Sequence, residues 1–85
     1  MKKTVFNNNR NVIFNQLKAA RLKAGLTQKQ LAAKMQVANI NIDQQMISKI
    51  EHNRRFVTDY ELACICGILD VTEKELLADY YVSLT

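Results

Sequence analysis

The feature that most constrains this chain is its scarcity of helix breakers, because its 85 residues include no proline and only two glycines. Such a chain favours helices joined by short turns. Three segments of the form Thr-x-x-Gln or Thr-x-x-Glu, at Thr27, Thr58 and Thr72, are typical of capping boxes. In a capping box the threonine and the residue three positions later satisfy backbone amides at a helix start. The sequence therefore predicts an all-α fold.

Apolar residues at three- and four-residue steps predict five helices. The first is expected over residues 11–24 and to end at Gly25, which adopts a left-handed conformation at no steric cost. The others are expected over residues 27–36, 43–52 and 58–67, and from residue 72 onward. Residues 37–42, with the sequence VANINI, alternate apolar and polar side chains and are expected to form an extended loop.

Charge is distributed unevenly along the chain, whose net charge is +4. Residues 1–55 hold 11 of the 12 lysines and arginines but only 2 of the 8 acidic residues. The remaining 30 residues are therefore acidic overall. This asymmetry indicates that the N-terminal part faces a polyanion, although many solvated helices are also basic.

Several other kinds of site and location are disfavoured. No apolar run is long enough to span a membrane, and the Asn-rich start does not resemble a signal peptide, so a cytoplasmic location is expected. Cys64 and Cys66 point to different sides of a helix, which disfavours a disulfide between them. His52 has no cysteine or carboxylate cluster around it, so a metal site is not expected. No cofactor or small-molecule ligand is evident from the sequence either. With no convergent nucleophile and base, the chain is not expected to be an enzyme.

The predicted third helix has two distinct faces. Asp43 is expected to cap it, and Met46, Ile47 and Ile50 fall on the apolar side. The opposite side carries polar residues and almost no acid: Gln44, Gln45, Ser48, Lys49 and His52. By itself, such a face is more often simply solvated.

Seven strings follow one another along the chain: Leu17-x-x-x-Arg21, Gly25-Leu26-Thr27-Gln28-x-x-Leu31-Ala32, Ile47-Ser48-Lys49-Ile50-Glu51, Asn53-x-Arg55, Glu61-Leu62, Leu69-Asp70-Val71 and Glu75-Leu76-Leu77. In order and content, these strings resemble the Cro/C1-type helix-turn-helix family, also called lambda repressor-like or XRE. The resemblance covers residues 12–78. It implies a five-helix domain that binds double-stranded DNA and inserts the helix at residues 43–52 into the major groove.

The resemblance also implies roles for individual residues. Gln44, Gln45, Ser48 and Lys49 would contact bases, which suits their chemistry: a glutamine amide can pair with adenine, and lysine can reach guanine acceptors. Contacts to phosphate would come from residues that start the second helix or follow the third: Gln28, Lys29, Asn53, Arg54 and Arg55. Arg21 and Glu51 would form a buried ion pair that fixes the recognition helix to the core.

This chain departs from the family pattern in three respects. Gln36 stands where a glycine is usual and a longer loop follows it; Asn53 and Asp70, which tolerate left-handed turns, stand where glycines are usual; and Phe56-Val57 stands where a proline usually precedes the fourth helix.

The loop at residues 37–42 is about five residues longer than usual; its isoleucines are expected to pack, and whether Asn39 and Asn41 contact DNA is left open. The aromatic tail at residues 80–85 could pack on the core, form a dimer contact or lead into another domain. The expected division is a flexible arm at residues 1–10, the helix-turn-helix domain at 11–79, and this tail.

These patterns lead to a hypothesis: a sequence-specific transcriptional regulator, such as a bacterial or phage repressor, that acts as a homodimer. The alternatives are an antitoxin, or a protein-interaction module that uses the same fold. An interaction module would favour an apolar or acidic third-helix face, which this sequence does not have.

Overall fold

The computed structural model describes residues 6–84, so residues 1–5 of the predicted arm and Thr85 lie outside the described residues. Within this range the all-α prediction is confirmed, and one isolated β-bridge, between Phe6 and Asn9, is the only extended pairing. The helices are α1 (Phe14–Lys23), α2 (Gln28–Val37), α3 (Gln44–Glu51), α4 (Asp59–Leu69), α5 (Glu73–Leu76) and α6 (Ala78–Ser83).

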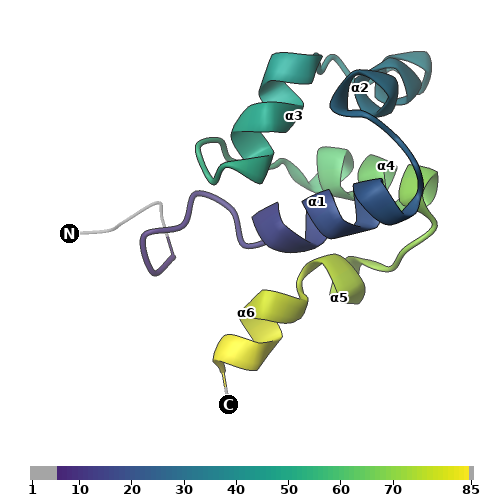
Figure 1. Ribbon diagram of the computed structural model, residues 1–85. Coiled ribbons are helices and arrows are strands. Elements are labelled where there is room, and N and C mark those ends of the chain that lie inside the picture. The colour runs from purple at the N-terminus through teal and green to yellow at the C-terminus, as the bar shows by residue number, and fades with distance from the viewer. Residues whose placement is uncertain (1–5, 85) are drawn as a thin grey trace.

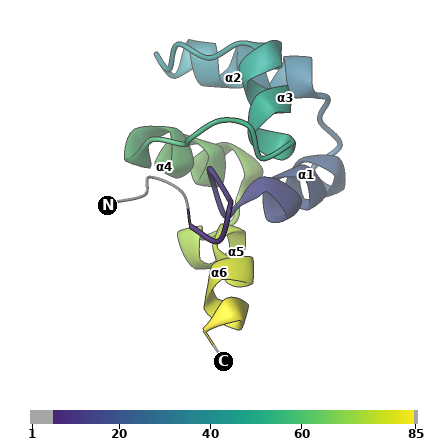
Figure 2. The ribbon, with the colours of Figure 1, turned by 90° about the vertical axis from the view of Figure 1, so that its left-hand side faces the viewer.

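The helices are arranged in three levels. In both views, α2 and α3 lie at one end, α1 and α4 in the middle, and α5 and α6 at the other end (Figures 1 and 2). Helix α3 contacts both α2 and α1, and α5 contacts both α1 and α4. Helix α6 therefore lies at the end of the molecule opposite α3 (Figure 1).

One apolar core joins these levels. Every helix except α6 contributes to it, and α3 does so through Ile47 and Ile50. Burying a side chain of this size stabilises the fold by about 1.5–3 kcal/mol. The side chains with almost no exposed surface are Leu17, Leu31, Met35, Ile42, Ile47, Ile50, Ile65 and Leu76.

All three predicted capping boxes are present. The hydroxyl oxygens of Thr27, Thr58 and Thr72 accept hydrogen bonds from backbone amides three residues on, and the side chains of Gln30, Glu61 and Glu75 accept from the threonine amides. These bonds satisfy amides that have no partner within the helix. Helices α2, α4 and α5 therefore begin where the sequence predicts.

The helices differ from the prediction in three main respects. Helix α1 begins at Phe14 and not at residue 11, because the side chain of Asn11 is buried and bonds to other backbone groups. Helix α4 continues two residues past Gly67 and ends at Leu69, and it is followed by the cap residue Asp70, which has φ 56°. A sixth helix, α6, begins after Leu77 and includes most of the predicted tail. The prediction of five helices was therefore one too few.

The connection between α2 and α3 packs back onto the domain. Ile42 is fully buried and Ile40 is half-buried against the core, as expected for the isoleucines. Asn39 has φ 70°, and the side-chain amide of Gln36 donates to the carbonyl oxygen of Ile42 at 2.7 Å. Val37 is 90% exposed and is the last residue of α2. The lengthened loop is thus anchored at the entry to α3.

Candidate nucleic-acid interface

Helix α3 has one buried and one polar face. Its first turn is capped by Asp43, whose carboxylate accepts from the amide of Met46 at 2.8 Å. Ile47 and Ile50 hold the inner face in the core. On the outer side, Gln44, Gln45 and Lys49 are exposed and Ser48 is half-buried. All four predicted base-contacting side chains therefore lie on one short helix whose position is fixed by its apolar side.

His52 continues this outer face. Residues 45, 48, 49 and 52 are spaced three, four and seven apart, so they share one side of the helix. The Nδ1 of His52 donates to the carbonyl oxygen of Ser48 at 2.7 Å, and the ring is exposed. The imidazole therefore adds a second hydrogen bond to a carbonyl oxygen that already accepts from the backbone amide of His52 at 3.0 Å.

The predicted ion pair between Arg21 and Glu51 is present. Arg21 Nε lies 2.6 Å from Glu51 Oε2, and Arg21 Nη2 lies 2.9 Å from Oε1, with side chains only 8% and 2% exposed. Arg21 Nη1 also donates to the carbonyl oxygen of Leu26 at 2.8 Å. The hydrogen bond to the carboxylate raises the pKa of Arg21 above its ordinary value. This pair connects α1, α3 and the turn before α2.

Gln28 joins the same network from the start of α2. Its Nε2 donates to Glu51 Oε1 at 3.1 Å, so Gln28 supports α3 directly. The neighbouring Lys29 is exposed on the first turn of α2. Of these two predicted phosphate contacts, one is already bonded to α3 and the other extends into solvent.

The segment after α3 begins with Asn53 and Arg54. Asn53 has φ 59°, the left-handed conformation that the sequence predicts there. The amide of Arg54 donates to the carbonyl oxygen of Lys49 at 2.8 Å, which closes the end of α3. The side chain of Arg54 is exposed, and no ion pair forms to it within residues 6–84. Arg54 is therefore a free cation beside the end of α3.

Arg55, in contrast, is held within the protein. Its Nη1 and Nη2 each lie 2.9 Å from a carboxylate oxygen of Glu61, and Nη1 also donates to the carbonyl oxygen of Phe56. The bonds to Arg55 lower the pKa of Glu61 and raise the pKa of Arg55. Sequence reasoning missed this pair and assigned Glu61 to a capping box alone. The sequence signal that could have indicated this pair is Arg55, an arginine six residues before the helix-capping Glu61.

Asn53 and Asn11 connect the N-terminal segment to the end of α3. The side-chain oxygen of Asn53 accepts from the amide of Arg10 at 2.8 Å and, more weakly, from the amide of Asn11 at 3.4 Å. Its Nδ2 donates to Asn9 Oδ1 at 2.7 Å. The buried Asn11 Nδ2 donates to the carbonyl oxygens of Ile50 and Arg55. Nothing local in the sequence marks these contacts, which join residues more than 35 positions apart.

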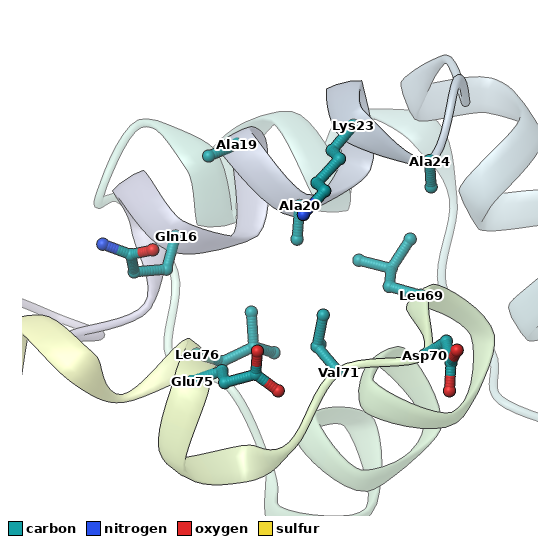
Figure 3. Close-up of a pocket in the computed structure, with 10 residues that line it drawn as sticks. All are labelled: Gln16, Ala19, Ala20, Lys23, Ala24, Leu69, Asp70, Val71, Glu75 and Leu76. Carbon is teal, nitrogen blue, oxygen red and sulfur yellow. The ribbon is translucent and has the colours of Figure 1, made fainter.

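A separate hollow lies away from α3. Its volume is about 510 Å³, and it opens between α1 and the turn from α4 to α5 (Figure 3). Its walls are largely apolar, and the carboxylate of Glu75 lies on the side opposite Lys23 (Figure 3). The residues that line it are Gln16, Ala19, Ala20, Lys23, Ala24, Leu69, Asp70, Val71, Glu75 and Leu76. None of them is a predicted site residue.

The described residues offer neither a metal-binding cluster nor a helix able to span a membrane. No group of three or more His, Cys, Asp or Glu side chains within residues 6–84 could hold a metal ion. In the same part of the chain, every helix is too short or too polar to cross a membrane.

Comparison with known proteins identifies the family. A family model described as helix-turn-helix matches residues 17–76. This range includes most of α1 and all of α2, α3, α4 and α5. No curated protein matches the chain. The matched region contains the ion pair, the capped α3 and its polar face. The chain therefore belongs to the Cro/C1-type helix-turn-helix family, membership of which implies DNA binding.

Proposed function

We propose that this protein is a sequence-specific transcriptional regulator that inserts α3 into the major groove of double-stranded DNA. The observation that carries the proposal is the polar outer face of α3, with Gln45 and Lys49 exposed while Ile47 and Ile50 anchor the helix. A helix held this way presents its side chains to base edges without moving the core.

The proposed base contacts are made by Gln44, Gln45, Ser48 and Lys49. A glutamine amide offers one donor and one acceptor, which match the N7 and N6 groups of adenine. Lysine can donate to the O6 and N7 of guanine. Ser48 is short and half-buried, so it allows a close approach and can bond to a base or to a phosphate.

The proposed backbone contacts fall into two groups. Lys29 and Arg54 are exposed cations with no ion pair among the described residues, so they can neutralise phosphates directly. Gln28, Asn53 and Arg55 use their side chains for bonds within the protein. Their contribution to phosphate contact therefore depends on the donors that these bonds leave available.

A homodimer is part of the proposal. Regulators with this motif bind two half-sites one helical turn apart, so that the symmetry of the protein matches that of the operator. Selection of binding sites from a pool of random duplex DNA tests function and symmetry together. We expect enrichment of an inverted repeat; enrichment of a single half-site would contradict the dimer, and no enrichment would contradict the regulator.

The base-reading residues are tested by Gln45→Ala, with Arg54→Ala as its matched control. Gln45→Ala is expected to relax base preference at one or two positions, whereas Arg54→Ala weakens binding to all sequences about equally. Affinity is measured for the selected site, single-base variants of it and random DNA. If Gln45→Ala lowers the affinity for selected and random DNA by the same factor, Gln45 does not read bases.

A further inference from the structure

The N-terminal segment is attached to the recognition helix through a group that we call the asparagine clasp: Asn9, Asn11 and Asn53. Asn53 holds the backbone at Arg10 and Asn11 and the side chain of Asn9. Asn11 is buried and donates to the carbonyl oxygens of Ile50, in the last turn of α3, and of Arg55. The backbone at Arg10 is therefore fixed beside the C-terminal end of α3.

Arg10 itself takes no part in the clasp through its side chain. The residue is exposed, and its guanidinium forms no hydrogen bond or ion pair within residues 6–84. Its backbone amide donates to Asn53, which immediately precedes the exposed Arg54. Two arginines far apart in sequence thus flank the same helix end, and each retains a charge that nothing in this part of the chain neutralises.

We propose that Arg10 is a further DNA phosphate-contacting residue and that the asparagine clasp positions it. This inference rests on the proposed function, since it requires α3 to lie in the groove. Phosphates line both edges of the major groove, so a cation fixed beside the end of the recognition helix lies next to one of those edges. Such a contact fixes the register of the protein on DNA and carries no base preference.

The main competing role for Arg10 is structural. Arg10 lines a hollow of about 390 Å³ together with Asp59, the first residue of α4, although the two form no ion pair. A weak attraction between them would affect folding stability and leave DNA binding unchanged. The two roles therefore predict changes in different measurements.

The test compares Arg10→Ala with Lys74→Ala in the full chain. Lys74 is an exposed cation on α5, at the end of the molecule opposite α3 (Figure 1), so it controls for the loss of one positive charge. Binding to random-sequence duplex DNA is titrated at a series of salt concentrations. Arg10→Ala is expected to reduce the slope of log affinity against log salt by about one, and Lys74→Ala to leave it nearly unchanged. Arg10→Lys is expected to keep most of the slope.

The role of the clasp is tested by Asn53→Gly, which keeps the left-handed backbone but removes the side-chain bonds. In that background, Arg10→Ala is expected to change the salt slope much less than in the parent chain, which a double-mutant cycle measures. Independent effects would overturn the positioning role of Asn53.

Two other outcomes separate this inference from the proposed function. If the parent protein and Arg10→Ala both bind DNA with the same slope of log affinity against log salt, the role of Arg10 alone is overturned. A lower melting temperature of that variant would then assign Arg10 a structural attraction to Asp59. Parent protein that fails to bind DNA at low salt overturns both proposals.

Discussion

The two arginine–glutamate pairs of this protein are both bidentate, but Arg21 bonds through Nε and Nη2 and Arg55 through Nη1 and Nη2, and the pairs lie at different positions in the fold. In each, two guanidinium nitrogens contact two carboxylate oxygens. Arg21 and Glu51 are 30 residues apart and connect α1 to α3, whereas Arg55 and Glu61 are six apart and connect the segment after α3 to α4. The first pair fixes α3 to the core, and the second fixes the chain that leaves α3.

Burial also distinguishes the two pairs. The side chains of Arg21 and Glu51 are 8% and 2% exposed, whereas those of Arg55 and Glu61 are 25% and 5% exposed. If its partner is removed, Arg21 remains a buried charge, but Arg55 can turn toward water. The comparison shows that an arginine close to α3 is not necessarily free to bind another molecule.

The largest expected effect comes from Glu51→Gln. Because this change leaves the buried Arg21 without a countercharge, we expect the free energy of unfolding to fall by about 3–5 kcal/mol. Urea unfolding followed by circular dichroism measures the loss. The double variant Arg21→Met/Glu51→Met is the control and is expected to recover much of the stability, since it removes both charges. A loss below about 1 kcal/mol would mean that the pair behaves as a surface ion pair.

A smaller effect is expected from Glu61→Gln, because glutamine can keep the capping box and only the ion pair is lost. We expect a loss of about 1 kcal/mol at neutral pH, given the partial exposure of Arg55. Bonding to Arg55 lowers the pKa of Glu61 in the folded protein below its ordinary value of 4.5. The contribution of its charge is therefore complete above that value and is lost as the pH falls through the lowered pKa.

The measurement is the unfolding free energy of the parent protein and of Glu61→Gln from neutral to acid pH. The difference between the two is expected to shrink as the solution becomes more acidic than pH 4.5. A difference that stays constant over this range would show that the charge of Glu61 does not stabilise the fold.

The smallest expected effect concerns DNA binding by Arg55. Arg55→Ala is expected to change the salt dependence of binding less than Arg54→Ala does, because Glu61 already neutralises the charge of Arg55. The free Nε and the remaining hydrogen of Nη2 are the donors that it could still offer to a phosphate. Salt titrations on the same DNA compare the two variants. Equal reductions in slope would show that Arg55 leaves Glu61 to bind phosphate.

Much of the fold could be predicted because its signals are local. A capping box joins residues three apart, and the apolar spacing of α3 separates Ile47 and Ile50 from Gln45 without knowledge of any other helix. The pair between Arg21 and Glu51 was expected from family resemblance and not from local pattern. Helix α6 was missed because its residues carry no capping signal. The late start of α1 was missed because the side chain of Asn11 bonds to the distant carbonyl oxygen of Ile50.

The sequence by itself therefore determined that the chain is helical, where its capped helices begin and which face of α3 is polar, because these depend on contacts within one turn of the chain. Only the tertiary structure decided which polar side chains near that face are already engaged. The bonds of Asn53 to the N-terminal segment span more than 40 residues, and the pairing of Arg55 with Glu61 depends on how the chain turns between α3 and α4. Such contacts depend on where the packed core places each segment, and local sequence does not encode that.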